Sequence, residues 1–136
     1  MLLGSKRHPA ISVVVAYLTP KLSVPVVNRA PVQRPDSFVR VTRVGGPKLN
    51  IATDGPMLTF ECWDVVSAEA LAMQVLDLLE NSPASLVEYQ DDAGNPHRAW
   101  ISSYTEVGAP TEHPDPSIPL SDRWVLTARL GIATNI

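Results

Sequence analysis

Histidines and paired carboxylates are the side chains of this sequence that could carry acid–base or metal chemistry. The three histidines are His8, His97 and His113. His113 lies two residues before Asp115 in a proline-rich stretch, but a zinc site needs three or four ligands and no other ligand is near in the sequence. Asp91-Asp92 could contact a hard cation, yet a single acidic pair in a turn is typically solvated. We therefore expect neither a metal ion nor a cofactor.

Motifs for nucleophilic catalysis and for phosphate binding are missing from the sequence. The serines form no G-x-S-x-G elbow, and there is no Walker A or G-x-G-x-x-G motif. Gly45-Gly46 is followed by Pro47 and by no predicted helix, so it cannot cradle a phosphate at a helix N-terminus. The one cysteine, Cys62, excludes an intrachain disulfide and fits a small buried hydrophobe on a strand. We expect a protein that is not an enzyme.

Arginines are the charged residues that stand out on the predicted strands. They are Arg40, Arg43, Arg123 and Arg129. One interpretation is that they lie on a solvated face of a sheet. The other is that they pair with Glu and Asp side chains of a neighbouring copy, because the planar guanidinium contacts a carboxylate through two hydrogen bonds and Arg is favoured at interfaces. The residues alone leave both interpretations open.

The segment 56–83 is the unit against which the other elements must pack. It begins with a predicted strand, in which polar residues alternate with Leu58, Phe60 and Cys62. A helix follows, with Ser67 as its N-cap, Glu69 in its first turn and Pro83 beyond its end.

The apolar face of this helix is predicted to form the core. Its residues recur at helical spacing and are Ala68, Leu71, Ala72, Val75, Leu78 and Leu79. We expect the four large aliphatic residues Leu71, Val75, Leu78 and Leu79 to be buried. Their expected partners on the sheet are Phe60, Leu126 and Leu130.

The remaining elements follow from alternation, β propensity and turn signals. Residues 9–19 fit either a short helix or a strand, and their apolar spacing favours the helix. Residues 108–121 form an extended polar loop, because their closely spaced prolines exclude a helix. Asp54-Gly55 is a turn signal that predicts a hairpin around it. The predicted strands are 24–27 at an edge, 37–44 and 57–63 in that hairpin, 85–89, 98–106 and 122–132.

Length and composition bound the fold class. The chain has 136 residues, 45% hydrophobic and 18% charged, which suits one globular domain over residues 1–136. An apolar run follows basic residues near the N-terminus, but it lacks a signal-peptidase site and is too short to span a bilayer, so we expect no membrane contact. The net charge of −3 argues against a nucleic-acid-binding surface. We predict an α+β fold, with a mainly antiparallel sheet of four to five strands and one or two helices packed on one face.

The order of these segments resembles that of a known protein family. The sequence reads FVRVTRVGG at 38–46, LTFECWD at 58–64, AEALAMQVLDLLE at 68–80 and RWVLTARLGI at 123–132. This order and spacing resemble the tail terminator proteins of long-tailed (siphovirus-type) phages, especially phages of actinobacteria, over residues 9–132. Trp124 stands where the family commonly has Tyr, and Asp64 stands where it commonly has Ala.

The resemblance implies a structural virion protein. Such proteins form a ring, typically a hexamer, on the head-proximal end of the tail tube. The ring stops tube polymerisation and presents a surface for head–tail joining. The implied partners are other copies of the chain, the tail tube protein and the head–tail connector protein, with DNA passing only transiently through the lumen. The implied location is the phage tail, and the host cytoplasm during assembly.

In such a ring, charged strand residues would face the neighbouring copy. The candidate subunit-interface residues are Arg40, Arg43, Glu61 and Arg123. Two alternatives stay open at this point. One is another small virion part, such as a head-closure or tail tube protein. The other is a small monomeric ligand-binding domain or enzyme.

Overall fold

The structure is a computed structural model that describes residues 6–118 and 120–134. The expected domain 1–136 and the expected loop 108–121 therefore include a few residues outside the described ones. The elements in chain order are α1 Ala10–Leu18, the short 3₁₀ helix η2 Thr19–Lys21, β1 Val26–Val27, β2 Ser37–Arg43, β3 Thr53–Asp54, β4 Met57–Asp64, α2 Ala68–Glu80, β5 Ser85–Gln90, β6 Pro96–Glu112 and β7 Asp122–Ala133.

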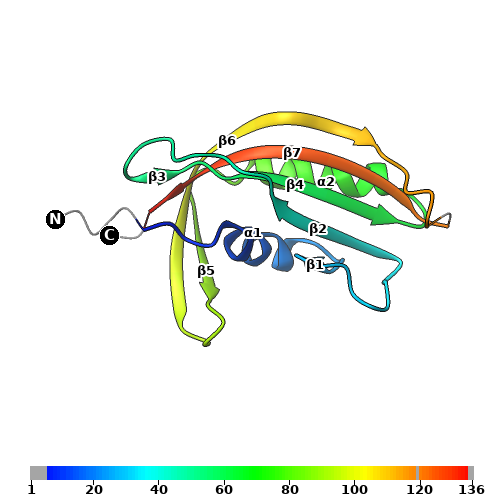
Figure 1. Ribbon diagram of the computed structural model, residues 1–136, viewed down its shortest axis with the longest axis horizontal. Helices are drawn as coiled ribbons and strands as arrows, with labels where there is room; N and C mark the ends of the chain where they lie inside the picture. The colour runs from blue at the N-terminus through cyan, green and yellow to red at the C-terminus, as the bar shows by residue number, and fades with distance from the viewer. Residues whose placement is uncertain (1–5, 119, 135–136) are drawn as a thin grey trace.

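A single curled sheet organises the molecule (Figure 1). Its strand order is β1-β2-β4-β7-β6-β5, and β3 pairs with β7 beyond the end of β4. The predicted α+β class and the hairpin of β2 with β4 are confirmed. The predicted sheet was too small and too uniform, because the described strands number seven and β1 runs parallel to β2. Strands β1 and β2 are parallel because the connection 28–36 returns along the sheet, so that β2 starts at the same end of the sheet as β1.

Strand β6 is much longer than its sequence suggests. The predicted strand ends at residue 106, whereas β6 continues to Glu112 and takes up the first part of the expected loop. Pro110 is tolerated because its missing N–H lies where the register with β7 slips between Gly108 and Thr111. Beyond Ile101, β6 pairs with β7 alone among the described strands. No strand on its outer edge therefore needs a hydrogen bond from the backbone N–H that Pro110 lacks.

The two helices form where the local signals predict them. Residues 10–18 are helical, which settles the choice between helix and strand for this segment. Helix α2 begins at the predicted N-cap, where Ser67 Oγ accepts a hydrogen bond from the backbone N–H of Ala70 at 3.3 Å. Glu69 lies in its first turn, as the positive end of the helix dipole favours.

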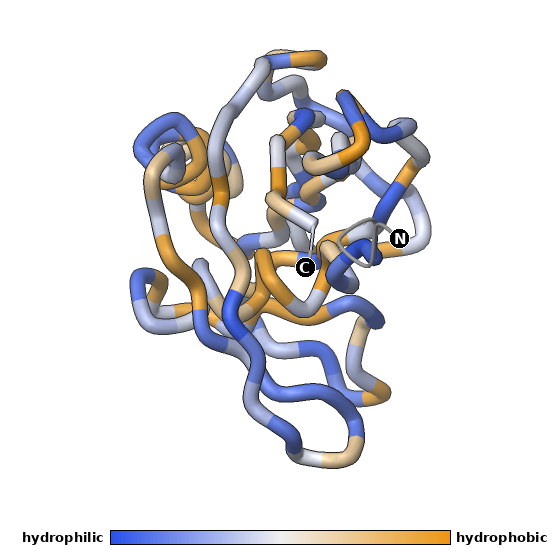
Figure 2. Tube along the Cα trace, turned by 90° about the vertical axis from the view of Figure 1, so that its left-hand side faces the viewer, coloured by the Kyte–Doolittle hydropathy of each residue, from blue (hydrophilic) through white to orange (hydrophobic). Residues whose placement is uncertain are grey.

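Both helices pack on the same face of the sheet and enclose one core. Figure 2 shows hydrophobic segments in the centre of the molecule and a hydrophilic tip on the β5–β6 hairpin. The strand residues of this core share one face and include Val39, Val41, Leu58, Phe60, Cys62, Leu126, Ala128 and Leu130. The prediction that Cys62 is buried is confirmed, and burial raises the pKa of its thiol to about 12.

One core residue was predicted wrongly. Leu71, Val75 and Leu79 are buried as expected, but Leu78 is only partly buried. Leu78 lies at the rim of the apolar stripe of α2, next to α1, where Tyr17 Oη donates a hydrogen bond to its carbonyl oxygen at 2.6 Å. The edge of the apolar face of α2 at Leu78 therefore contacts α1 through Tyr17.

Leu79→Ala should destabilise the fold by about 2–5 kcal/mol, because its fully buried side chain would leave a cavity between α2 and the sheet. Urea denaturation followed by circular dichroism measures the change in the free energy of unfolding. Gln74→Ala on the exposed face of the same helix is the matched control, with an expected change within about 0.5 kcal/mol. Equal losses in the two variants would place the core on another face of α2.

Candidate functional site

The face of the sheet opposite the helices is open, and three of the predicted interface residues meet there. Arg40 on β2 lies opposite Glu61 on β4, and Arg123 on β7 lies diagonally across from Glu61. Arg40 Nη1 is 3.4 Å from Glu61 Oε2, and Arg123 Nη1 is 3.0 Å from Glu61 Oε1. One carboxylate is thus shared by two guanidinium groups within a single chain. We call the outward-facing surface of β2, β4 and β7 the open face.

Three threonines cross the middle of the open face. Thr42 lies opposite Thr59, and Thr59 lies opposite Thr127, where the two hydroxyl oxygens are 3.3 Å apart. These threonines form a strip of small polar side chains between Arg40 and Arg129. Such a surface remains solvated in the free chain and can also be covered by another protein surface.

An aromatic cluster closes one end of the open face. Phe38 and Trp63 stack with their ring centres 5.8 Å apart, and both are almost fully buried although they point away from the helices. The guanidinium groups of Arg34 and Arg123 lie 4.8 and 5.1 Å from the centre of the Trp63 ring. Residues 34–36 and the side chains of Ile118, Leu120 and Ser121 lie around the two rings and line a pocket of about 150 Å³ beside them. This cluster is a second, smaller apolar centre.

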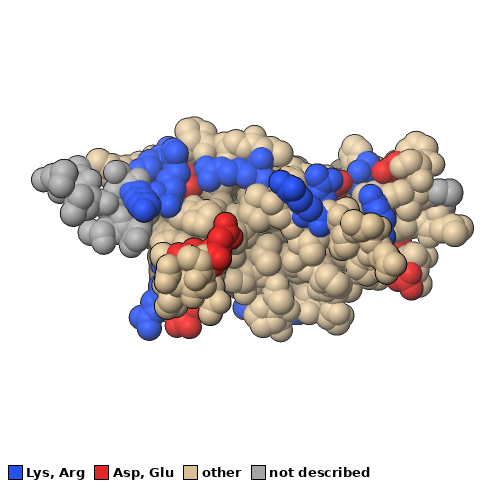
Figure 3. Space-filling model, turned by 60° about the horizontal axis from the view of Figure 1, so that its bottom comes forward, with Lys and Arg blue, Asp and Glu red and all other residues tan. Residues whose placement is uncertain are grey.

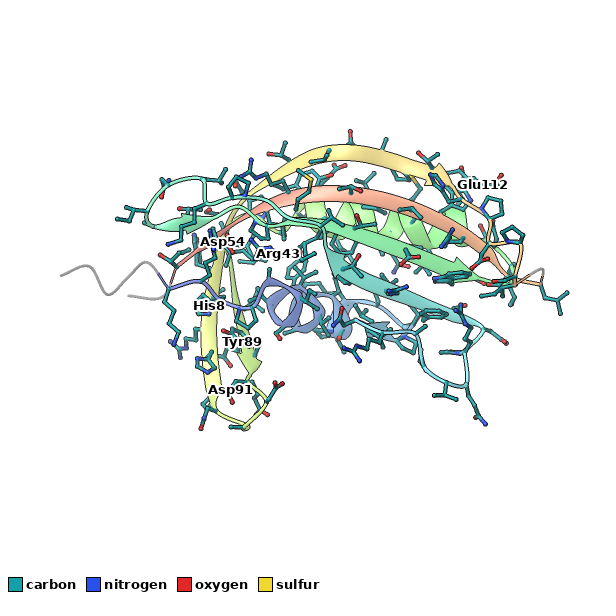
Figure 4. The ribbon with its side chains drawn as sticks, in the orientation of Figure 1. His8, Arg43, Asp54, Tyr89, Asp91 and Glu112 are labelled. Carbon is teal, nitrogen blue, oxygen red and sulfur yellow. The ribbon has the colours of Figure 1, made fainter. Side chains whose placement is uncertain are left out.

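The fourth predicted interface residue, Arg43, lies elsewhere. Its position shares the face of Val39 and Val41, so the alternation of β2 turns it toward the side of the helices. Both of its terminal nitrogens bind Asp54, each at 3.1 Å (Figure 4). Arg7 Nε contacts the same carboxylate at 3.0 Å. Asp54 is 1% exposed and lies in β3; the sequence suggested it only as part of a turn signal and not as a partner of Arg43. The alternation of β2 could have shown this difference, because it places Arg43 at the end of the strand on the core face and Arg40 on the opposite face.

The arginines also hold the loop between β2 and β4. Arg43 donates to the carbonyl oxygens of Gly45 and Gly46 at 3.1 and 3.0 Å. Arg129 donates to those of Gly55 and Pro47 at 3.0 and 2.6 Å. The two side chains come from opposite faces of the sheet, so the loop 44–56 is held from both sides. Both arginines thereby act within the chain, as anchors of a long hairpin tip.

Arg43→Met should destabilise the fold by about 3–5 kcal/mol, because it leaves the buried carboxylate of Asp54 with Arg7 alone. Urea denaturation again reports the free energy of unfolding. Arg98→Met is the matched control, since its partner Glu88 and Arg98 itself are both more than 70% exposed, and the expected loss is below about 1 kcal/mol. A loss for Arg43→Met as small as that of the control would show that Arg43 does not stabilise Asp54.

A cluster of titratable side chains lies at the same end of the molecule as Asp54, and sequence reasoning missed it. His8 Nδ1 is 2.6 Å from Tyr89 Oη, and the rings of Tyr89 and His97 stack with their centres 5.2 Å apart. His97 Nε2 is 2.9 Å from Asp91 Oδ2. These residues and Arg7 line a pocket of about 220 Å³, and Figure 4 shows His8, Tyr89 and Asp91 along the hairpin of β5 and β6. Burial lowers the pKa of His8, and the nearby His97 lowers it further.

The contacts of Asp91 indicate what this cluster does. Its Oδ1 accepts hydrogen bonds from the backbone N–H groups of Ala93 and Asn95 at 3.0 and 2.8 Å, so it closes the hairpin turn. The hydrogen bond from His97 and those backbone donors lower the pKa of Asp91 to about 2. Within residues 6–118 and 120–134, no three His, Cys, Asp or Glu side chains converge as a metal site requires. The cluster ties the segment before α1 to the β5–β6 hairpin.

Asp91→Asn should lower stability most above pH 4 and least near pH 2. In the folded state the pKa of Asp91 is about 2, below its ordinary value of 3.8. The stabilisation by the ionised carboxylate is therefore complete above pH 3.8 and is lost as the pH falls through 2. Urea denaturation from pH 2 to pH 7 measures the gap from the wild type. Asp92→Asn removes the same charge from the next residue and controls for net charge. A gap that does not change with pH would contradict the coupling of Asp91 to folding.

Comparisons with known proteins add no family assignment. No family model matches the chain, and no curated protein matches it. In the part of the chain that the structure describes, no helix is long and apolar enough to cross a membrane.

Proposed function

We propose that this chain is a structural subunit of a phage tail, which assembles into a ring at the head-proximal end of the tail tube. In that position the ring ends tube polymerisation and presents a surface for joining the head. The proposal rests on the resemblance of segments 38–46, 58–64, 68–80 and 123–132 to tail terminator proteins. The observation that best supports it is the open face, an ordered surface of charged and small side chains that the helices leave uncovered.

The charge of the open face favours a protein partner on it. Among its strand positions, Arg40, Arg123 and Arg129 face outward with Glu61 as the only carboxylate. A ring through which DNA passes should not present such a basic surface to its lumen, because phosphate groups would bind there and resist translocation. We therefore propose that neighbouring copies cover the open face. The net charge of −3 suits the surfaces that remain exposed.

The two ends of the sheet supply surfaces for the tube and for the connector. Strands β2, β4 and β7 and the later part of β6 run along the length of the molecule, with connecting loops at each end (Figure 1). Large exposed apolar side chains gather in these loops: Val44, Leu49 and Ile51 at one end, and Val32, Val65, Val66 and Leu120 at the other. Scattered exposed apolar residues need no explanation, but groups at both ends favour contacts above and below a ring.

The mass of the assembled protein tests this proposal. We expect the purified chain to form a closed ring, either alone or on tail tubes, and light scattering after size exclusion measures the mass in units of the 14.8 kDa chain. Electron microscopy with purified tail tubes should show the ring at one end of each tube. It should also show tube growth stopping when the protein is added to tube subunits.

Other outcomes separate the alternatives. Open-ended tubes formed by the chain alone would indicate a tail tube protein, and binding to the head connector without binding to tubes would indicate a head-closure protein. A chain that stays monomeric with tail tubes and connector present would overturn the proposal and favour a monomeric binding domain. Circular dichroism on the same sample controls for folding.

A further inference from the structure

Helix α2 presents an acidic stripe to solvent. Its exposed residues Glu69, Met73, Asp77 and Glu80 recur at spacings of four, four and three, so they lie on one face of the helix. The helix contains no Lys or Arg. Met73 is 44% exposed in the middle of the stripe. We call these four residues the acidic stripe, an apolar centre with carboxylates on both sides.

Charge is separated along the sequence, and the fold keeps it separated. Eight of the eleven Lys and Arg residues lie within 1–48, with Asp36 as the only carboxylate there. Residues 64–122 hold eleven of the fourteen carboxylates, with Arg98 as their only basic residue. Figure 3 shows the result on one side of the molecule, where Lys and Arg side chains form a band along its length with few carboxylates inside it.

The acidic stripe and the open face point in opposite directions. Helix α2 packs on β4, β6 and β7 from the core side, and in Figure 1 it lies behind β4 and β7. The open face is the other side of these same strands. A two-fold symmetric contact would place like charges together on either surface. A contact between the two surfaces must be head-to-tail, and head-to-tail contacts close into rings when the rotation between copies allows it.

We propose that the acidic stripe of one copy docks on the open face of the next copy in the ring. This inference rests on the proposed ring and specifies which two surfaces form each contact. Asp77 and Glu80 would face the guanidinium groups of Arg40 on the open face and of Arg34. Arg34 is exposed in the segment before β2 and lies over Trp63 at the end of that face. A guanidinium carries five N–H donors, so Arg40 can hold Glu61 and still bind a carboxylate from outside.

The centre of the contact fits the same arrangement. Met73 would lie over the small side chains of Thr42, Thr59 and Thr127, with Met57 and Val125 as apolar neighbours on the same face. A flexible thioether adapts to such a surface. Apolar contact in the middle with charges around it is the usual anatomy of a protein interface, in which the outer charges set register and the rate of association.

Two charge-reversed variants test the proposal. Variant one is Asp77→Lys with Glu80→Lys, which also places cations in the last turn of α2, where the helix dipole favours them. Variant two is Arg34→Glu with Arg40→Glu. Each variant alone would place like charges across every contact, and we expect the concentration needed for ring assembly to rise at least about tenfold. An equimolar mixture of the two should assemble again, because each variant is complementary to the other.

The control is Glu88→Lys with Asp92→Lys, which changes the net charge as variant one does but on the β5–β6 hairpin. It should assemble like the wild type. Light scattering measures mass, and circular dichroism confirms folding of each variant.

The outcomes separate this inference from the proposed function. If the wild type forms rings and variant one does so equally well, the acidic stripe is not the docking surface, although the ring proposal stands. If each variant fails alone and the mixture also fails, the two surfaces do not face each other, and the inference is wrong. If the wild type forms no ring under any condition, the proposed function is wrong, and the docking inference that rests on it is wrong as well. Recovery in the mixture alone establishes the pairing.

Discussion

The pairing of β4 with β7 creates the apolar surface on which the rest of the molecule is built. Their register sets Phe60 beside Leu126 and Leu58 beside Ala128, all of them fully or almost fully buried. Because side chains alternate along a strand, the same register sends Glu61 and Thr59 to the opposite face. Both helices then bury the apolar side, so on the polar side only the Phe38–Trp63 end is covered by described segments of the chain.

Arginines connect this central pair to the periphery in two different ways. At one end, Arg43 and Arg7 neutralise the buried carboxylate of Asp54 and so hold β3, the end of β2 and the segment before α1 together. On the open face, Arg40 and Arg123 share Glu61, which remains 14% exposed. Burial distinguishes the two groups. The carboxylate of Asp54 is desolvated and therefore requires a cationic partner. The ion pairs of Arg40 and Arg123 with Glu61 are partly exposed, so their guanidinium groups can accept an additional carboxylate.

The separation of charge gives the molecule a direction. The basic N-terminal third forms α1, β1, β2 and the loops around them, while the acidic segment forms α2, β5 and β6. In the proposed ring, this separation would favour one orientation between neighbouring copies, although the net charge is small. It would also disfavour stacking of copies in several registers.

Local patterns were enough to predict much of this protein. Alternation placed β4 and β7, spacing and the Ser67 cap placed α2, and the same alternation would have assigned Arg43 to the core side. These features depend on neighbours within a few residues, and the sequence determines them by itself. The α+β class and the one-sided packing of the helices follow from them.

Tertiary structure decided the features that depend on contacts between distant segments. The extension of β6 to Glu112 required β7 as a partner, since prolines in that stretch oppose a strand on local grounds. The pairs of His8 with Tyr89 and of Arg7 with Asp54 join residues far apart in sequence, so no spacing could reveal them. Whether a charged strand residue faces solvent, a partner on the next strand or a buried carboxylate is likewise fixed by register and burial, which exist only in the folded chain.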